Sequence, residues 1–244
     1  PALIGCGGSK TASPDDAPAK AALATVAARP GVERERLARA IDGLFSDELA
    51  GETRALLVMH EGRIVAERYG EGYGKDTRLV GWSMTKSITG VLIGMLVADG
   101  RLRLEETAAV PAWERTGDPR GEITLRQLLQ MRSGLRHTEG GDPLYRSDEV
   151  RMLFLDGRDD MAAYAEAQPL EAVPGRKFEY SSATSIILSD IATRALTANP
   201  DPTTRRLAIS DYLRTRLFEP LGMQSMSPEY DASGTFIGSS LIHG

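Results

Sequence analysis

Apolar residues in the first third of the chain follow two different periods. Between residues 32 and 45 they recur at helical spacing, which predicts an amphipathic helix. Two β-prone runs follow, residues 55–60 and 63–69, and the Glu61-Gly62 pair between them is typical of a tight turn. The pattern therefore predicts a helix followed by a β-hairpin.

A longer apolar stretch, residues 88–97, predicts a buried helix that begins near Ser83 and runs to about Ala98. Gly100 would end this helix, because glycine readily takes the left-handed conformation found at helix C-termini. The stretch is too short to span a bilayer. Apolar spacing farther along the chain predicts helices at residues 124–130, 148–156, 159–167, 182–196 (with Ser181 or Ser182 as its cap) and 209–217.

Composition narrows the classes of function. The 244 residues carry a formal net charge of −5, and 41% are hydrophobic, which is ordinary for a globular protein. The basic residues are scattered, so neither nucleic acid nor an anionic membrane surface is an expected partner. The single cysteine, Cys6, allows no internal disulfide. His60, His137 and His243 lack metal-ligand spacing, so we expect no metal and no cofactor.

Candidate chemistry stands where the long apolar stretch begins. Ser83 and Lys86 are three residues apart, so on a helix they share one face and place a hydroxyl beside an amine. Such a pair supplies a nucleophile and a base, provided that burial keeps the amine neutral. Only five of the 29 basic residues are Lys, and Arg could not serve as this base because its guanidinium keeps its proton. An N-cap serine beside a solvated lysine is the alternative interpretation.

The beginning of the sequence carries a separate signal. Leu3-Ile4-Gly5-Cys6 resembles the bacterial lipobox, in which the cysteine becomes the lipidated N-terminus of an exported lipoprotein. The polar stretch that follows suits a flexible tether, and we expect a tether over residues 1–30. The alternative is a chance tetrapeptide. The first interpretation predicts an envelope protein that contacts the membrane only through a lipid anchor on Cys6.

Five segments of the chain carry motifs in a fixed order: residues 83–87 with Gly90 and Gly94, residues 123–135, residues 174–182, residues 218–223 and residues 231–240. Together they resemble the motifs of the serine β-lactamase-related hydrolases. This family includes class C β-lactamases, D-Ala-D-Ala carboxypeptidases, esterases and the nylon-oligomer (6-aminohexanoate dimer) hydrolases. The last segment is most similar to the nylon-oligomer hydrolase branch, and the resemblance covers about residues 32–244.

The resemblance implies an α/β fold in which an antiparallel sheet is flanked by helices and carries a mainly helical insertion. It implies that Ser83 is acylated, that Lys86 is the base and that Tyr180 relays a proton to the leaving group. Ser182 stands where the family motif has Asn, so β-lactam recognition is not expected from this position. Trp82 and Tyr145 are further candidates for contact with substrate, although core packing and an ordinary surface position are the respective alternatives.

The family's third motif and its C-terminal strands have no counterpart up to residue 244. The resemblance therefore implies a complementary C-terminal segment, on this chain or on another. Within the chain we expect an α/β part at 31–105, a helical part at 106–220 and the start of a return to the α/β part at 221–244. The expected activity is hydrolysis of small amides or esters. A β-lactamase, a D,D-peptidase and a catalytically silent envelope lipoprotein are the alternatives.

Overall fold

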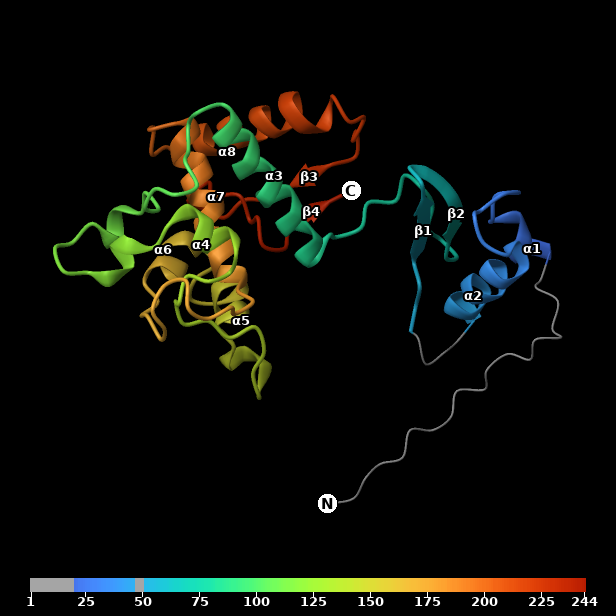
Figure 1. The fold of residues 1–244 in the computed structure, drawn as a ribbon, viewed down its shortest axis with the longest axis horizontal. Helices are drawn as coiled ribbons and strands as arrows, with labels where there is room; N and C mark the ends of the chain where they lie inside the picture. The colour runs from blue at the N-terminus through green and yellow to red at the C-terminus, as the bar shows by residue number, and fades with distance from the viewer. Residues whose placement is uncertain (1–19, 47–50) are drawn as a thin grey trace, which may run out of the picture. The chain divides into compact units, whose positions relative to one another are not determined.

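The computed structural model describes residues 20–46 and 51–244. The chain divides into two units, Pro1–Thr77 and Arg78–Gly244 (Figure 1). This boundary differs from the predicted division after residue 105, because the apolar helix that follows Ser83 packs with the later helices of the second unit. Cys6 lies outside the described residues.

The first unit contains the predicted helix and hairpin. Helix α2 spans Arg34–Ser46, and strands β1 (Ala55–His60) and β2 (Arg63–Tyr69) pair antiparallel. Glu61 and Gly62 both have positive φ, 49° and 73°, which suits a two-residue turn between twisted strands. A small apolar core joins these elements; its buried members are Ala22, Val26, Ala38, Ile41 and Ala66.

The prediction of a tether through residue 30 does not hold for the described residues 20–30. Helix α1 spans Lys20–Ala24, and Val26 bridges to Ala66 of β2. Ala22 is fully buried and Val26 is 3% exposed. The Ala-rich composition resembles a linker, but burying these small side chains against α2 and β2 stabilises an ordered segment.

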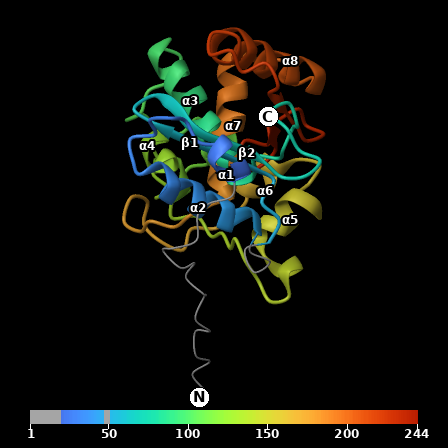
Figure 2. The same cartoon turned by 90° about the vertical axis from the view of Figure 1, so that its right-hand side faces the viewer.

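The second unit is mainly helical and centres on α7. This helix spans Ser182–Leu196, and every residue from Ser182 to Thr193 is buried. Helix α7 packs against α3, α4, α5, α6 and α8, and both views place it in the middle of the unit (Figures 1 and 2). The bounds of the other helices are α3 Thr85–Ala98, α4 Leu125–Leu129, α5 Asp148–Phe154, α6 Met161–Glu166 and α8 Pro202–Leu213. The short helical turns are η2 Trp82–Met84, η3 Pro111–Trp113, η4 Pro119–Glu122, η5 Leu144–Arg146 and the π-turn η6 Arg214–Phe218.

Side-chain caps fix where several of these helices begin. Ser181 accepts a hydrogen bond from the Thr184 N–H and caps α7, as one of the two predicted alternatives had it. Thr124 and Gln127 form a reciprocal capping box on α4. Helix α8 begins at Pro202, seven residues before the predicted start. Asp201 caps it and proline suits its first position, two signals that apolar spacing does not report.

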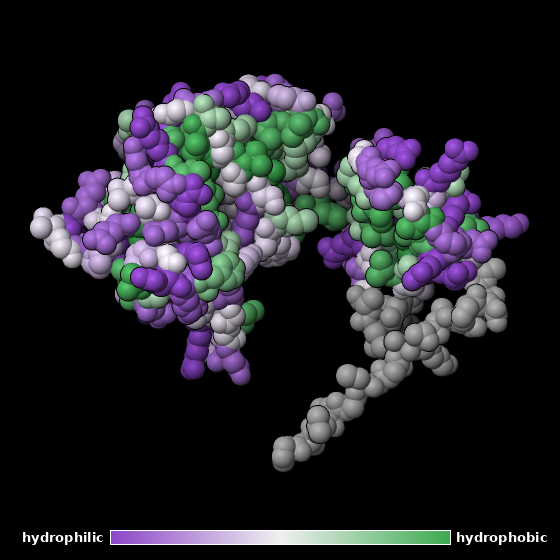
Figure 3. Space-filling view, viewed as in Figure 1, coloured by the Kyte–Doolittle hydropathy of each residue, from purple (hydrophilic) through white to green (hydrophobic). Residues whose placement is uncertain are grey.

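The described strands form two separate antiparallel pairs, β1 with β2 and β3 (Ser227–Pro228) with β4 (Ile242–His243). With many helices and little sheet, the fold is of the α/β class that the sequence predicted. None of the described helices is both long and apolar enough to cross a bilayer. In the second unit, α3 leaves Val91 44% exposed, and Figure 3 shows apolar surface among the polar side chains of this unit.

Candidate active site

Ser83 lies in η2, the tight turn that leads directly into α3. Gly81 anchors the turn by donating its N–H to the Ile242 carbonyl at 2.7 Å, and a Cβ on Gly81 would meet that oxygen at 3.1 Å. Trp82 has φ 43°, a left-handed conformation that is strained for a bulky residue. The turn thus holds an exposed Ser83 at the N-terminal end of α3, where the helix dipole favours negative charge.

Lys86 joins three segments that are far apart in the sequence. Its Nζ lies 3.0 Å from Ser83 Oγ, 3.0 Å from Ser182 Oγ and 2.9 Å from the Ser239 carbonyl oxygen. The sequence analysis required burial of this side chain, but the structure leaves it half-buried. Its position is therefore fixed by these three contacts, from η2, from the start of α7 and from the segment before β4.

The Ser239 carbonyl reaches Lys86 because Gly238 allows a close approach of backbone to helix. The Gly238 carbonyl accepts a hydrogen bond from Thr89 Oγ1 of α3 at 2.7 Å. A Cβ on Gly238 would lie 2.1 Å from Ser189 Oγ and 2.4 Å from Thr89 Oγ1. Only glycine fits between α3 and α7 at this point.

Tyr180 contacts Lys86 through the face of its ring. The Nζ of Lys86 lies 4.9 Å from the ring centroid, within the range of a cation–π contact, and Tyr180 is 42% exposed. The backbone just before it is held by a hydrogen bond from the Glu179 N–H to the Met131 carbonyl, at 2.9 Å. Tyr180 is thus beside the amine as predicted, and its role in proton transfer stays a prediction.

Ser182 faces inward. It is 1% exposed, and its hydroxyl is shared between Lys86 and Glu139, with Oγ 3.1 Å from Glu139 Oε2. The Ser182 N–H also donates to Glu139 Oε1, at 2.5 Å. A hydroxyl committed in this way is not available to a substrate. The predicted assignment of Ser182 to substrate binding is therefore replaced by a place in the interior network behind Lys86.

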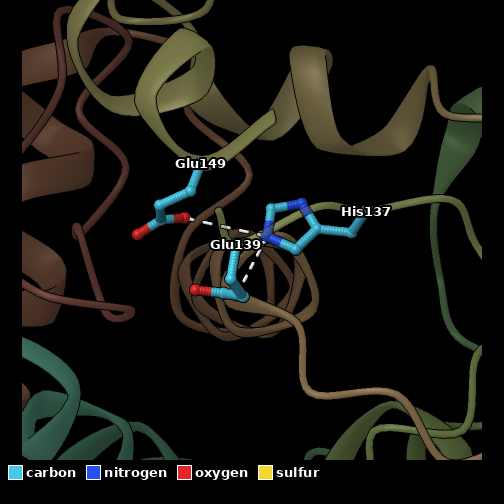
Figure 4. A group of neighbouring side chains, drawn as sticks. All are labelled: His137, Glu139 and Glu149. Atoms are coloured by element: carbon cyan, nitrogen blue, oxygen red, sulfur yellow. Dashed lines mark hydrogen bonds and ion pairs between the residues drawn. The ribbon is translucent and has the colours of Figure 1, made fainter. Parts of the chain in front are cut away.

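A buried histidine and a second glutamate complete this network (Figure 4). The His137 side chain has no exposed surface, and its Nε2 lies 2.9 Å from Glu139 Oε1 and 3.8 Å from Glu149 Oε2. Burial raises the pKa of Glu139, but hydrogen bonds from His137 and from the Ser182 N–H outweigh it, so that pKa lies below its ordinary value. Burial, and then the charge of Glu139, raise the pKa of Glu149.

His137, Glu139 and Glu149 each offer a ligand atom within 4.8 Å of the others, the spacing of a candidate metal site. Part of the donor set is already used, however. Glu139 is a carboxylate that accepts from Ser182, so His137 Nε2 must carry the proton between His137 and Glu139. A nitrogen that bears this proton has no free lone pair for a metal. Within the described residues, His137 Nδ1 and Glu149 Oε2 have no hydrogen-bond partner, so the network does not satisfy every member of the cluster.

The remaining predicted residues differ in their placement. Trp82 is 53% exposed beside Ser83, so the alternative of core packing is wrong. Tyr145 lies on η5 and is 60% exposed, which agrees with the surface alternative. Sequence reasoning missed Glu139, His137 and Ser239. The only local signal was the glycine before Ser239, in a segment already singled out by its resemblance.

The family model for β-lactamase (Beta-lactamase) matches residues 34–236. None of the curated proteins matches the chain. Among solved structures, a candidate 6-aminohexanoate-dimer hydrolase from Bacillus anthracis superposes with a TM-score of 0.62 at 21% identity. That match covers 84% of this chain and 53% of the other, so the chain spans about half the length of this structure.

Two further structures share the fold. A candidate beta-lactamase from Bacteroides dorei superposes with a TM-score of 0.58 at 22% identity, with 84% of this chain and 58% of the other covered. The structure of SurE superposes with a TM-score of 0.52 at 26% identity, with 80% of this chain and 41% of the other covered. The arrangement of helices in the second unit is thus one that solved structures also contain.

Proposed function

This chain belongs to the β-lactamase family, and we propose that it is a serine hydrolase that cleaves small amides or esters through an acyl-enzyme. The observation that carries the proposal is the 3.0 Å contact between Lys86 Nζ and Ser83 Oγ at the start of α3. A serine hydroxyl is a weak nucleophile until an adjacent base takes its proton, and this contact supplies the base.

In the proposed reaction, Ser83 Oγ transfers its proton to the neutral amine of Lys86 and attacks the substrate carbonyl carbon. The C–O bond forms, and the carbonyl electron pair moves onto oxygen. The N–H groups at the start of α3, including that of Ser83, stabilise this oxyanion. When the intermediate collapses, the leaving amine or alcohol takes the proton from Lys86, directly or through Tyr180. Water then attacks the acyl-enzyme in the same way and restores Ser83.

The substrate class follows from what surrounds the serine. Ser182 stands where the family motif carries Asn, and its hydroxyl is engaged by Lys86 and Glu139. That leaves no side-chain amide at this position to bind a β-lactam substituent. The likeness in sequence motif and fold to a candidate 6-aminohexanoate-dimer hydrolase supports small linear amides and esters.

Export as a lipid-anchored envelope protein is a separate part of the proposal. Its support is the Leu3-Ile4-Gly5-Cys6 tetrapeptide. Growth of producing cells with a labelled fatty acid tests it: label should appear on the protein and be lost in Cys6→Ala. Equal label in both proteins would contradict lipidation at Cys6.

Acylation by an active-site probe tests the hydrolase. The protein is incubated with a fluorophosphonate and, in parallel, with a fluorescent penicillin, and the intact mass is recorded. We expect one fluorophosphonate adduct on Ser83, no adduct in Ser83→Ala, and slower labelling by penicillin. A protein that no probe modifies at Ser83, although it is folded, would contradict the proposal and favour a binding protein.

A further inference from the structure

We propose that Glu139 is a positioning residue that acts through Ser182 and aims the lone pair of the Lys86 amine at Ser83. The inference rests on the proposed function and deepens it. It assigns a role to a carboxylate that is hydrogen-bonded to Ser182 and His137 and is linked to Lys86 through the Ser182 hydroxyl.

A neutral lysine amine has two N–H groups and one lone pair. The lone pair must point at Ser83 Oγ for Lys86 to accept the proton, so both N–H groups need acceptors elsewhere. The Ser239 carbonyl oxygen, 2.9 Å away, can only accept and takes one of them. The remaining neighbour is Ser182 Oγ at 3.0 Å, a hydroxyl that is able both to donate and to accept.

Glu139 removes that ambiguity. Its Oε2 lies 3.1 Å from Ser182 Oγ and, as a carboxylate, can only accept, so the Ser182 hydroxyl proton points to Glu139. Ser182 Oγ is then left as an acceptor toward Lys86. With both N–H groups engaged, the lone pair of Lys86 is left for Ser83. Without Glu139, Ser182 could donate its proton to that lone pair and occupy it.

Glu139 itself is held in one orientation. Its Oε1 accepts the Ser182 N–H at the first turn of α7, a helix of 15 residues whose N-terminus favours an anion. The same oxygen accepts from Nε2 of His137, whose side chain is fully buried. These bonds keep Glu139 ionised, in agreement with its lowered pKa. The charged and titratable groups around it are Lys86 on α3, Glu149 on α5, His137 on its own loop and Tyr180 before α7.

The test measures how fast a fluorophosphonate phosphonylates Ser83, with Oγ bonding to phosphorus and fluoride leaving. The variants are Glu139→Gln, Ser182→Ala and the double variant, and the rate at saturating probe is separated from the probe's apparent affinity. We expect Glu139→Gln to lower the saturating rate about ten- to a hundredfold, a fraction of the about 10²–10⁴ that general base catalysis contributes. Apparent affinity should change little, because Glu139 is linked to Lys86 only through the buried Ser182 hydroxyl. Glu139→Asp keeps the carboxylate and should recover part of the rate.

The double variant distinguishes positioning from a structural role. If Glu139 acts only through the Ser182 hydroxyl, adding Glu139→Gln to Ser182→Ala should cost little more than Ser182→Ala alone. Rate losses that multiply, or a change in affinity alone, would overturn the inference. If Glu139→Gln does not fold, Glu139→Asp and Ser182→Ala carry the test: unchanged rates in both would overturn it.

The wild-type protein separates the two proposals. Labelling at Ser83 in the wild type, with an equal rate in Glu139→Gln, refutes the role of Glu139 and leaves the hydrolase intact. No labelling of the folded wild type refutes the hydrolase, and the inference that rests on it falls too. Thermal unfolding of every variant confirms that the compared proteins are folded.

Discussion

The carbonyl oxygen of Ser239 accepts a hydrogen bond from the Nζ of Lys86 at 2.9 Å, although 153 residues separate them. A main-chain oxygen cannot be lost by substitution at its own position. The contact therefore depends on the path of the backbone between α8 and β4 rather than on the identity of residue 239. Substitutions that move this path should alter the site without touching any of its side chains.

Removal of the proposed nucleophile is the first expectation. Ser83→Ala should abolish probe labelling and ester hydrolysis, because Ser83 carries the exposed hydroxyl that contacts Lys86, whereas the Ser182 hydroxyl at the same distance is buried. The fold should persist, with a stability change of at most about 1–2 kcal/mol. Hydrolysis of p-nitrophenyl acetate and thermal unfolding check both points. Undiminished hydrolysis in this variant would exclude Ser83 as the nucleophile.

Lys86→Arg tests whether the reaction at Ser83 needs a positive charge at position 86 or a base that can accept a proton. Arg keeps the charge but cannot give up its proton, so we expect a loss of acylation rate of at least about a hundredfold. The rate of labelling by a fluorophosphonate, followed by intact mass, measures it. A variant with near wild-type rate would show that position 86 contributes only positive charge.

Gly238→Ala should disturb the site from a distance. The added Cβ would overlap Ser189 Oγ and Thr89 Oγ1, so the segment must move and carry the Ser239 carbonyl away from Lys86. We expect a loss of about 1–3 kcal/mol in the free energy of unfolding, together with slower acylation. Gly94→Ala is the matched control, because a Cβ there meets nothing within 4 Å and the residue lies within α3. Equal behaviour of the two variants would contradict the packing argument.

Substrate preference gives a fourth expectation. The protein should hydrolyse p-nitrophenyl acetate faster than nitrocefin, because Ser182 offers no amide to a β-lactam and its hydroxyl is engaged within the protein. Ser182→Asn, which restores the residue of the family motif, would disrupt the bond to Glu139 and should not create efficient β-lactam hydrolysis. A clear preference of the wild type for nitrocefin would refute the proposed substrate class.

Glu166 predicts a pH dependence of stability that is separate from the site. Burial raises its pKa from 4.5 to about 7, with Arg194 opposing the shift. The folded protein therefore holds a proton that the unfolded chain releases, so stability falls as pH rises from about 4.5 to 7. Glu166→Gln should remove this loss, which is at most about 3 kcal/mol.

Urea unfolding at pH 5 and pH 8 measures the effect. The free energy of unfolding of Glu166→Gln, measured relative to the wild type, should be higher at pH 8 than at pH 5. The exposed Glu114→Gln is the control and should show no such difference. A Glu166→Gln profile parallel to that of the wild type would mean that Glu166 is ionised throughout this range.

Local features of the chain were predictable, and contacts between distant segments were not. The approach of Ser83 and Lys86 follows from their spacing across one helical turn, and the cap of α7 follows from the serines that precede it. Apolar periodicity likewise located α2, α3 and the hairpin. In each case the information lies within a few neighbouring residues.

Glu139 shows which kind of contact could not be predicted from the sequence. Its partner Ser182 lies 43 residues away, and nothing in the sequence around either residue indicates that they meet. His137 lacks metal-ligand spacing in the sequence, and no local pattern around it predicts that its side chain is buried. Its burial beside two carboxylates depends on how the loop before η5 packs on α5 and α7, which is tertiary information. Helix α1 was missed because its Ala-rich sequence has no distinctive apolar period.

The left-handed conformation of Trp82 links the stability of the fold to the residue that precedes the proposed nucleophile. Glycine would adopt φ 43° at little cost, whereas tryptophan in that conformation reduces the stability of the native state. A search for stabilised variants of this protein would therefore tend to replace Trp82. Such variants would lose the half-exposed indole that stands next to Ser83. The thermal stability of this protein and the surface beside Ser83 are thus linked through one backbone torsion.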